Sequence, residues 1–231
     1  MFTHPGRKLA LLIGNSYITN PDIRSVPARD DVNGFKKLLI DRLGFKNKNI
    51  YISIDNKIMP IIKDFLKKCK ENDLVLIYYS GHGKSLRSSI YLPKNVGLCS
   101  SWVDPDNTTV FSYHIDQLLS EINIKCKIIL LSDSCYSGEF LRYYKGKNTV
   151  YFIGSSSSIT KSSSHIINGE KKLGGLVYLF DYLTQKYGDN INFDKIIENS
   201  KEFTKNNGIL RFMCLKKIII NIKNGSKRPQ R

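Results

Sequence analysis

The 231-residue sequence contains no long hydrophobic run and no paired cysteine motif. No apolar run approaches the roughly 18–20 residues that span a bilayer, and residues 1–8 lack the apolar core of a secretory signal. The five cysteines are irregularly spaced without a CxxC pair, which argues against a zinc site or a redox motif. These absences predict a soluble, cytoplasmic protein with reduced thiols and no membrane partner.

Acidic residues are scarce, since 20 Asp and Glu stand against 36 Lys and Arg, for a formal net charge of +16. Such a surplus is compatible with nucleic acid, an anionic surface or an acidic partner. It is equally compatible with a Lys- and Asn-rich composition spread over solvated faces, which we favour. No recognised nucleic-acid-binding motif and no basic stripe interleaved with aromatic residues is present, so we predict no specific nucleic-acid partner.

Apolar runs alternate with amphipathic segments along the chain. Runs typical of buried strands lie at residues 8–13, 49–54, 73–79, 128–131, 149–153 and 211–222. Helical spacing occupies residues 30–43, 57–70, 115–122, 176–187 and 193–206. We interpret residues 155–164 and 165–175 as loops. The alternation predicts an α/β fold with a parallel sheet covered on both faces. We expect a single domain over residues 1–231, with its core at about 8–222 and a basic tail at 223–231.

Two reactive side chains follow two of the predicted strands. His82 comes three residues after the strand at 73–79, and Cys135 follows the strand at 128–131 by a similar interval. Because sites in open parallel sheets lie beyond the carboxyl ends of the strands, both side chains should reach the same edge. A thiol attacks a carbonyl as the thiolate, and an imidazole can take up its proton. The pair therefore predicts nucleophilic catalysis by Cys135 and His82.

Small residues surround both predicted catalytic residues. Gly81 and Gly83 flank His82, and they allow the backbone to approach a bound peptide closely. An oxyanion hole needs N–H donors fixed at the developing negative charge. The backbone amides of Gly83 and Cys135 are the natural candidates for these donors. The other histidines and cysteines lack such surroundings, and we interpret them as surface or structural residues.

Three segments carry a resemblance to a known family. Residues 9–15 read LALLIGN, residues 78–83 read YYSGHG and residues 130–138 read LLSDSCYSG. They resemble the signature segments of caspase-like cysteine proteases, and most closely those of metacaspases, which read roughly YSGHG and DSCHSG. As in caspases, the His lies about 50 residues upstream of the Cys. The resemblance implies the caspase-hemoglobinase fold, with a six-stranded, mostly parallel sheet between helices, and peptide-bond cleavage by a Cys–His dyad.

The resemblance also implies residues that bind the substrate. Asp133 matches an aspartate in the primary specificity pocket of metacaspases, where caspases usually have glutamine. Ser80 matches another pocket position. Asp31 matches a second pocket acid, although Ala28 replaces the family's cysteine in that segment. A carboxylate attracts Lys or Arg and repels Asp, so we expect cleavage of protein or peptide substrates after Arg or Lys. Arg24 lies near the position at which caspases have an arginine that binds the substrate aspartate. Cleavage after Asp is therefore the lesser alternative.

Structural roles are alternatives for the same positions. Asp31 lies near the start of a predicted helix, where a carboxylate suits the helix dipole. Ser80 is also typical of a turn, and Asp133 could orient backbone amides at a strand end. Tyr136 replaces the family's usual histidine. These features leave a catalytically weak or inactive caspase-like scaffold as the main alternative function.

The sequence offers little for a cofactor or a dimer interface. Many metacaspases need calcium held by several carboxylates, but basic residues occupy most of the corresponding positions here. Asp104, Asp106 and Asp116 remain as possible ligands, and we predict no metal and no other cofactor. The last predicted strand carries Lys216 and Lys217. Lysines at a sheet edge discourage strand pairing, which predicts a monomer.

Overall fold

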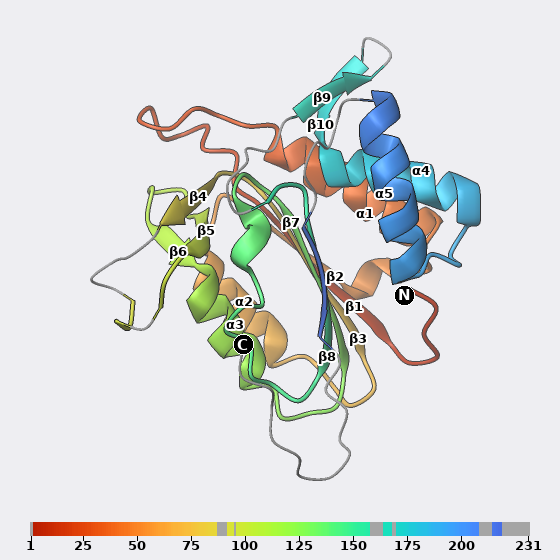
Figure 1. The fold of residues 1–231 in the computed structure, drawn as a ribbon, viewed down its shortest axis with the longest axis horizontal. Coiled ribbons are helices and arrows are strands. Elements are labelled where there is room, and N and C mark those ends of the chain that lie inside the picture. The colour runs from red at the N-terminus through yellow and green to blue at the C-terminus, as the bar shows by residue number, and fades with distance from the viewer. Residues whose placement is uncertain are drawn as a thin grey trace.

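A six-stranded sheet forms the centre of the computed structural model (Figure 1). The structure describes residues 2–86, 92–94, 96–157, 164–167, 170–207 and 214–218. In spatial order the strands are β11 (Cys214–Ile218), β8 (Thr149–Gly154), β7 (Lys127–Asp133), β3 (Leu74–Ser80), β1 (Lys8–Gly14) and β2 (Ile50–Ile54). All neighbours are parallel except β11, which pairs antiparallel with β8 at one edge. The predicted six-stranded, mostly parallel sheet is confirmed.

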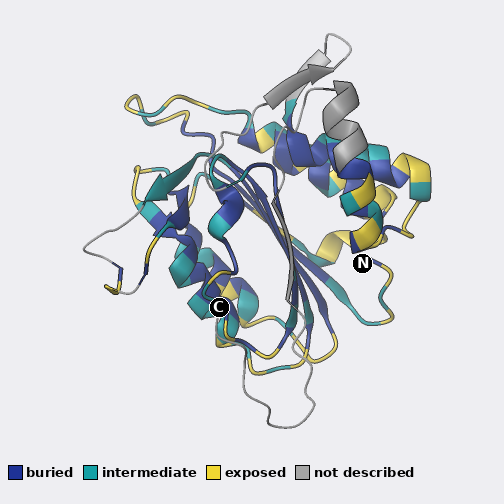
Figure 2. Ribbon diagram, viewed as in Figure 1, coloured by how far each residue is buried: buried dark blue, intermediate teal, exposed yellow. Residues whose placement is uncertain are grey.

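Helices cover both faces of this sheet (Figure 1). The helices α1 (Ala28–Asp41), α4 (Gly175–Tyr187) and α5 (Phe193–Asn207) pack on one face, and α2 (Ile58–Leu66) and α3 (Ser112–Ser120) pack on the other. Successive strand residues point to opposite faces, and Figure 2 shows the resulting burial of the strands between the helices. The predicted α/β architecture is therefore confirmed. No helix in the described ranges has the length and apolarity needed to cross a membrane.

Helix α1 illustrates how the sequence pattern positions the edge of the sheet. Val32, Phe35 and Leu39 recur at helical spacing and are buried against the strands. The Phe35 ring stacks on the ring of Tyr78 in β3, with 4.6 Å between centroids. This packing places the first turn of α1, including Asp31, beyond the carboxyl ends of the central strands.

Two smaller sheets differ from the sequence interpretation. The strands β4 (Gly83–Leu86), β5 (Cys99–Val103) and β6 (Thr109–Phe111) form an antiparallel sheet. The strands β9 (Ser164–Ile167) and β10 (Glu170–Gly174) pair as a hairpin, so the loop predicted at 165–175 is wrong. These strands are short and carry no sustained apolar alternation, and backbone pairing holds them instead. The predicted basic tail at 223–231 lies outside the described residues.

Candidate active site

The segments that carry His82 and Cys135 leave neighbouring strands at the same edge of the sheet. In the β3–β7 pairing, Ser80 lies opposite Asp133, so both segments start from the same level. Gly83 then lies directly against the backbone of Cys135, and a methyl group on Gly83 would overlap the Cys135 carbonyl oxygen. This close approach requires glycine and brings the two predicted catalytic segments into contact.

Contacts on both the ring and the backbone hold His82, which is half-buried. The ring Nε2 lies 2.6 Å from the backbone carbonyl oxygen of Arg24, whose side chain is exposed. The His82 ring also packs on Tyr17, with 4.8 Å between centroids. Because a carbonyl only accepts hydrogen bonds, Nε2 is the donor. In a neutral imidazole this leaves Nδ1 as the nitrogen that can take up a proton.

Serine hydroxyls hold the turn around Cys135. Ser156, which follows β8, donates from Oγ to the carbonyl of Ser134 at 2.8 Å and accepts from the amide of Ser137 at 3.1 Å. Tyr136, which lies between Ser134 and Ser137, has a left-handed φ of 55°, which is uncommon for a bulky residue. The hydrogen bonds on both sides offset that strain. Ser156 was not singled out from the sequence, where its only distinction is membership of a serine cluster after a strand.

The three predicted pocket residues meet beside the start of α4, and all three side chains are buried. Ser80 Oγ donates to Asp31 Oδ2 at 2.6 Å, and the Gly174 amide donates to Asp31 Oδ1 at 2.7 Å. The Leu176 amide donates to Asp133 Oδ2 at 3.0 Å. A methyl group on Gly174 would overlap the Asp133 carboxylate and lie 3.1 Å from Asp31 Oδ2. Two carboxylates therefore converge on the same backbone segment.

Burial and neighbouring negative charges raise the pKa values of both carboxyls of this pair. Burial, together with the neighbouring charge of Asp31, raises the pKa of Asp133 to about 7. Burial also raises the pKa of Asp31 to about 6, although hydrogen bonds from Ser80 and Gly174 oppose the rise. The pair therefore carries less than two full negative charges near neutral pH, and a cation bound between the carboxylates would restore them.

Replacing Asp133 with asparagine is expected to stabilise the protein at pH 8 by about 1–3 kcal/mol. The folded Asp133 carboxyl has the higher pKa, so the wild type loses stability as the pH rises from about 4 through about 7. Asparagine does not ionise, so the variant keeps this part of its stability over this pH range. Urea unfolding at pH 5.5 and pH 8 measures the difference, with the exposed Asp22→Asn as the matched control. If the unfolding free energy depends on pH in the same way in wild type and in Asp133→Asn, the raised pKa of Asp133 is contradicted.

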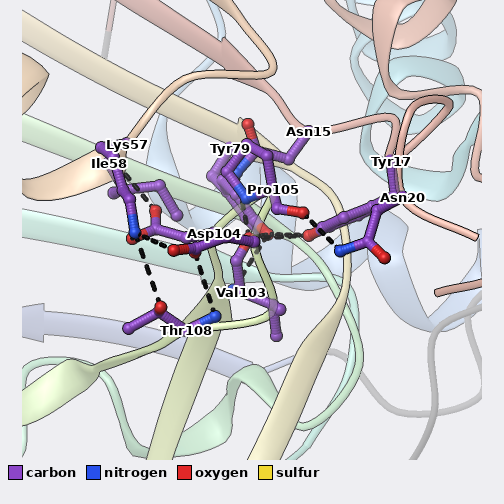
Figure 3. A network of polar contacts seen from close by, with 11 residues as sticks. Asn15, Tyr17, Asn20, Lys57, Ile58, Tyr79, Val103, Asp104, Pro105 and Thr108 are labelled. Atoms are coloured by element: carbon purple, nitrogen blue, oxygen red, sulfur yellow. Dashed lines mark hydrogen bonds and ion pairs between the residues drawn. The ribbon is translucent and has the colours of Figure 1, made fainter. Parts of the chain in front are cut away.

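The acids considered as calcium ligands are engaged by protein groups. The donors are the Ile58 amide for Asp104, the Lys57 ammonium for Asp106, and the amides of Leu141 and Tyr143 for Asp116. Figure 3 shows Asp104 beside Lys57 and Ile58 at the start of α2. Within the described part of the chain, no cluster of three or more His, Cys, Asp or Glu side chains is placed to hold a metal.

Comparison with known proteins agrees with this architecture. Residues 7–214 match the family described as Caspase domain. Metacaspase-6 of Arabidopsis thaliana is 30% identical over 207 residues, which cover 82% of this chain and 56% of the relative. Metacaspase-1 of Schizosaccharomyces pombe is 26% identical over 159 residues, covering 59% of this chain and 35% of the relative. The matched region thus spans from about a third to just over half of these relatives.

A solved structure shares the fold at low sequence identity. The crystal structure of protein GSU0716 from Geobacter sulfurreducens superimposes with a TM-score of 0.64, 13% identity and coverage of 92% of this chain and 93% of the other. At this identity the likeness shows the fold alone. The family match extends over most of the sequence, and the curated relatives named above are metacaspases. The chain therefore belongs to the caspase domain family and is close to the metacaspases.

Proposed function

We propose that the protein is a cysteine endopeptidase in which Cys135 is the nucleophile and His82 is the general base. The observation that carries this proposal is the contact between the two strand-end segments, where Gly83 packs on the backbone of Cys135. The Arg24 carbonyl supports it, because it binds Nε2 of His82 and leaves Nδ1 for the thiol proton. Membership of the caspase family gives the same chemistry independent support.

The reaction follows from the roles of these groups. The Cys135 thiol passes its proton to His82, and the thiolate attacks the scissile carbonyl carbon to form a carbon–sulfur bond. The amides of Gly83 and Cys135 stabilise the oxyanion. His82 then gives the proton to the leaving amine as the peptide bond breaks. In the second half, His82 removes a proton from water, the hydroxide attacks the thioester carbon, and the carbon–sulfur bond breaks to release the carboxyl product. The departing Cys135 thiolate takes the proton back from His82.

The proposed substrates are proteins or peptides with Arg or Lys before the cleaved bond. Asp31 and Asp133 offer two buried carboxylates at the site edge. Ionised, the pair has about eight lone-pair sites, more than are taken up by the donors Ser80, Tyr78, Ser155 and the amides of Gly174 and Leu176. A guanidinium or ammonium group would lower the energy of the ionised pair, whereas a substrate aspartate would raise it. The carboxylate pair therefore favours cleavage after basic residues over the Asp-specific alternative.

Fluorogenic peptides ending in Arg, Lys or Asp test the proposal. We expect wild type to cleave the Arg and Lys peptides, with no turnover by Cys135→Ala. Faster cleavage of the Asp peptide would refute the basic pocket, and full activity of Cys135→Ala would refute the nucleophile. Absence of any turnover in the wild type would favour the scaffold alternative.

The remaining parts of the proposal concern cofactor and cellular setting. We propose a cytoplasmic monomer that needs no metal and binds neither membrane nor specific nucleic acid. The protein donors around Asp104, Asp106 and Asp116 support metal independence. In the peptide assay, a calcium chelator should leave the rate unchanged. A loss of activity that added calcium restores would overturn this part.

A further inference from the structure

Two tyrosine hydroxyls bind the backbone of His82 from both sides. The His82 amide donates to the hydroxyl of Tyr17 at 3.1 Å, and the hydroxyl of Tyr79 donates to the His82 carbonyl at 2.9 Å. Both tyrosines are buried. Tyr17 lies in the segment after β1, and Tyr79 lies at the end of β3. The backbone amide and carbonyl of the proposed general base are thus both bonded to phenols, one from a distant segment and one from three residues earlier in the chain.

The same hydroxyls bind Val103 at the end of β5 (Figure 3). Tyr17 donates to the Val103 carbonyl at 2.7 Å, and the Val103 amide donates to the Tyr79 hydroxyl at 3.2 Å. The two phenol oxygens lie 3.0 Å apart. Each hydroxyl has one proton, and one assignment satisfies the four bonds to the backbone of His82 and Val103, although the Tyr79 hydroxyl also lies 3.2 Å from the Val103 carbonyl. Tyr17 gives its proton to Val103, and Tyr79 gives its proton to His82.

This arrangement replaces a direct pairing of His82 with Val103. In the β4–β5 ladder, Gly83 lies opposite Trp102, so the next pair in register would be His82 and Val103. A hydrogen-bonded antiparallel pair exchanges two N–H···O bonds. Here the Tyr17 hydroxyl bridges the His82 amide and the Val103 carbonyl, and the Tyr79 hydroxyl bridges the Val103 amide and the His82 carbonyl. The phenols therefore lie between the two segments and set how far His82 is held from β5.

Two local features make room for the phenols. A methyl group on Gly81 would overlap the Tyr79 hydroxyl and lie 3.1 Å from the Tyr17 hydroxyl, so the residue before His82 must be glycine. Tyr17 has a left-handed φ of 59°, an uncommon conformation for a bulky residue. The Asp55 carboxylate accepts hydrogen bonds from the amides of Ser16 and Tyr17 and offsets this strain.

We propose that Tyr17 and Tyr79 are positioning residues, whose hydroxyls fix the orientation of the His82 imidazole toward Cys135. The ring of Tyr17 adds a second constraint, because it packs on the imidazole itself. This inference rests on the function proposed for His82 and Cys135. Burial raises the pKa of both phenols above the ordinary value, so they remain neutral donors over the range in which a Cys–His pair titrates.

Phenylalanine substitutions test the proposal, because they remove each hydroxyl and keep the ring. For Tyr17→Phe and Tyr79→Phe we expect kcat to fall about 10-fold each, and KM to change little, since misplacement of a catalytic group acts on the chemical step. Iodoacetamide labelling of Cys135, followed by peptide mass spectrometry from pH 5 to 10, needs no substrate. In both variants the apparent pKa of Cys135 should move toward the value of about 8.5 of an isolated thiol.

Tyr144→Phe is the matched control. The buried hydroxyl of Tyr144 also bridges backbone groups, since it accepts from the Asn148 amide at 3.0 Å and donates to the Asn148 carbonyl at 3.1 Å. Asn148 immediately precedes β8 and lies at the opposite end of the parallel strands. We expect Tyr144→Phe to lower the stability to urea about as much as Tyr17→Phe and Tyr79→Phe do. Its kcat and its Cys135 labelling should stay unchanged.

The outcomes separate this inference from the proposed function. If Tyr17→Phe and Tyr79→Phe behave like Tyr144→Phe, the positioning role is overturned and the dyad stands. If wild type and His82→Ala give the same labelling profile, the dyad is refuted and the positioning role fails with it. Should a phenylalanine variant fail to fold, Gly81→Ala serves as a second variant, because its methyl group displaces the same hydroxyls. A Gly81→Ala protein with unchanged kcat and labelling would also overturn the role.

Discussion

Replacing His82 with alanine is expected to lower kcat for an Arg-ending peptide by about 10²–10⁴-fold. The imidazole is the only group to which we assign proton transfer, and the hydrogen bond from Nε2 to the Arg24 carbonyl leaves Nδ1 as the proposed proton acceptor. The side chain is half-buried and contributes little to the core, so the variant should fold. Steady-state kinetics measure the loss, and KM should stay within a few-fold of wild type.

The matched control for this variant is His114→Ala. His114 is also half-buried, and its ring contacts Phe111 and Tyr113 edge to face, at centroid distances of 5.8 and 5.5 Å. It lies in α3, away from the two strand-end segments, so its removal should leave kcat unchanged. A His82→Ala enzyme that retains more than a third of wild-type kcat would contradict the assignment of the general base.

Replacing Gly83 with alanine is expected to lower kcat/KM by about 100-fold, because a misplacement of about 1 Å in a catalytic group has an effect of this size. The added methyl group would overlap the Cys135 carbonyl and lie 3.0 Å from Ser134 Oγ. Both neighbours belong to a turn held from two sides by Ser156, so the segments must separate. The forced shift should also cost about 1–3 kcal/mol of unfolding free energy.

Gly97→Ala provides the comparison for Gly83→Ala. A methyl group on Gly97 would meet no heavy atom within 4 Å, so the same chemical change should alter neither activity nor stability. Peptide kinetics and urea unfolding on the two variants give the answer. An active Gly83→Ala enzyme with unchanged stability would mean that the His82 and Cys135 segments do not pack as described, and would remove the main support for the proposed dyad.

Strand periodicity made the central sheet and the site edge predictable from sequence. Each buried strand is a compact apolar run, and the rule that sites lie beyond the carboxyl ends of parallel strands selects His82 and Cys135 without knowledge of the structure. The family resemblance added Asp31, Ser80 and Asp133, and the structure brings these three side chains together. These features depend on local pattern or on a local motif, which a single sequence displays.

Contacts between distant segments explain what the sequence could not supply. Tyr17 reaches His82, and Ser156 reaches Ser134, only after strands have paired, so neither residue carries a local signal. The strands β4–β6, β9 and β10 are short and mostly lack apolar alternation, and only their partners define them. The backbone bonds from Gly174 to Asp31 and from Leu176 to Asp133 likewise depend on tertiary packing, although a bond from a backbone amide to Asp133 is an alternative that the sequence itself suggests.

The parallel pairing of β3 with β7 also has a consequence for the order of events during folding. His82 and Cys135 lie on segments that follow two neighbouring strands of the sheet but are far apart in the chain, and these segments meet only when Ser80 comes opposite Asp133. Such non-local pairing is slow to form compared with helices and hairpins. In a nascent or partly collapsed chain, Cys135 and His82 are therefore still apart. The proposed catalytic dyad assembles late, together with the completed sheet.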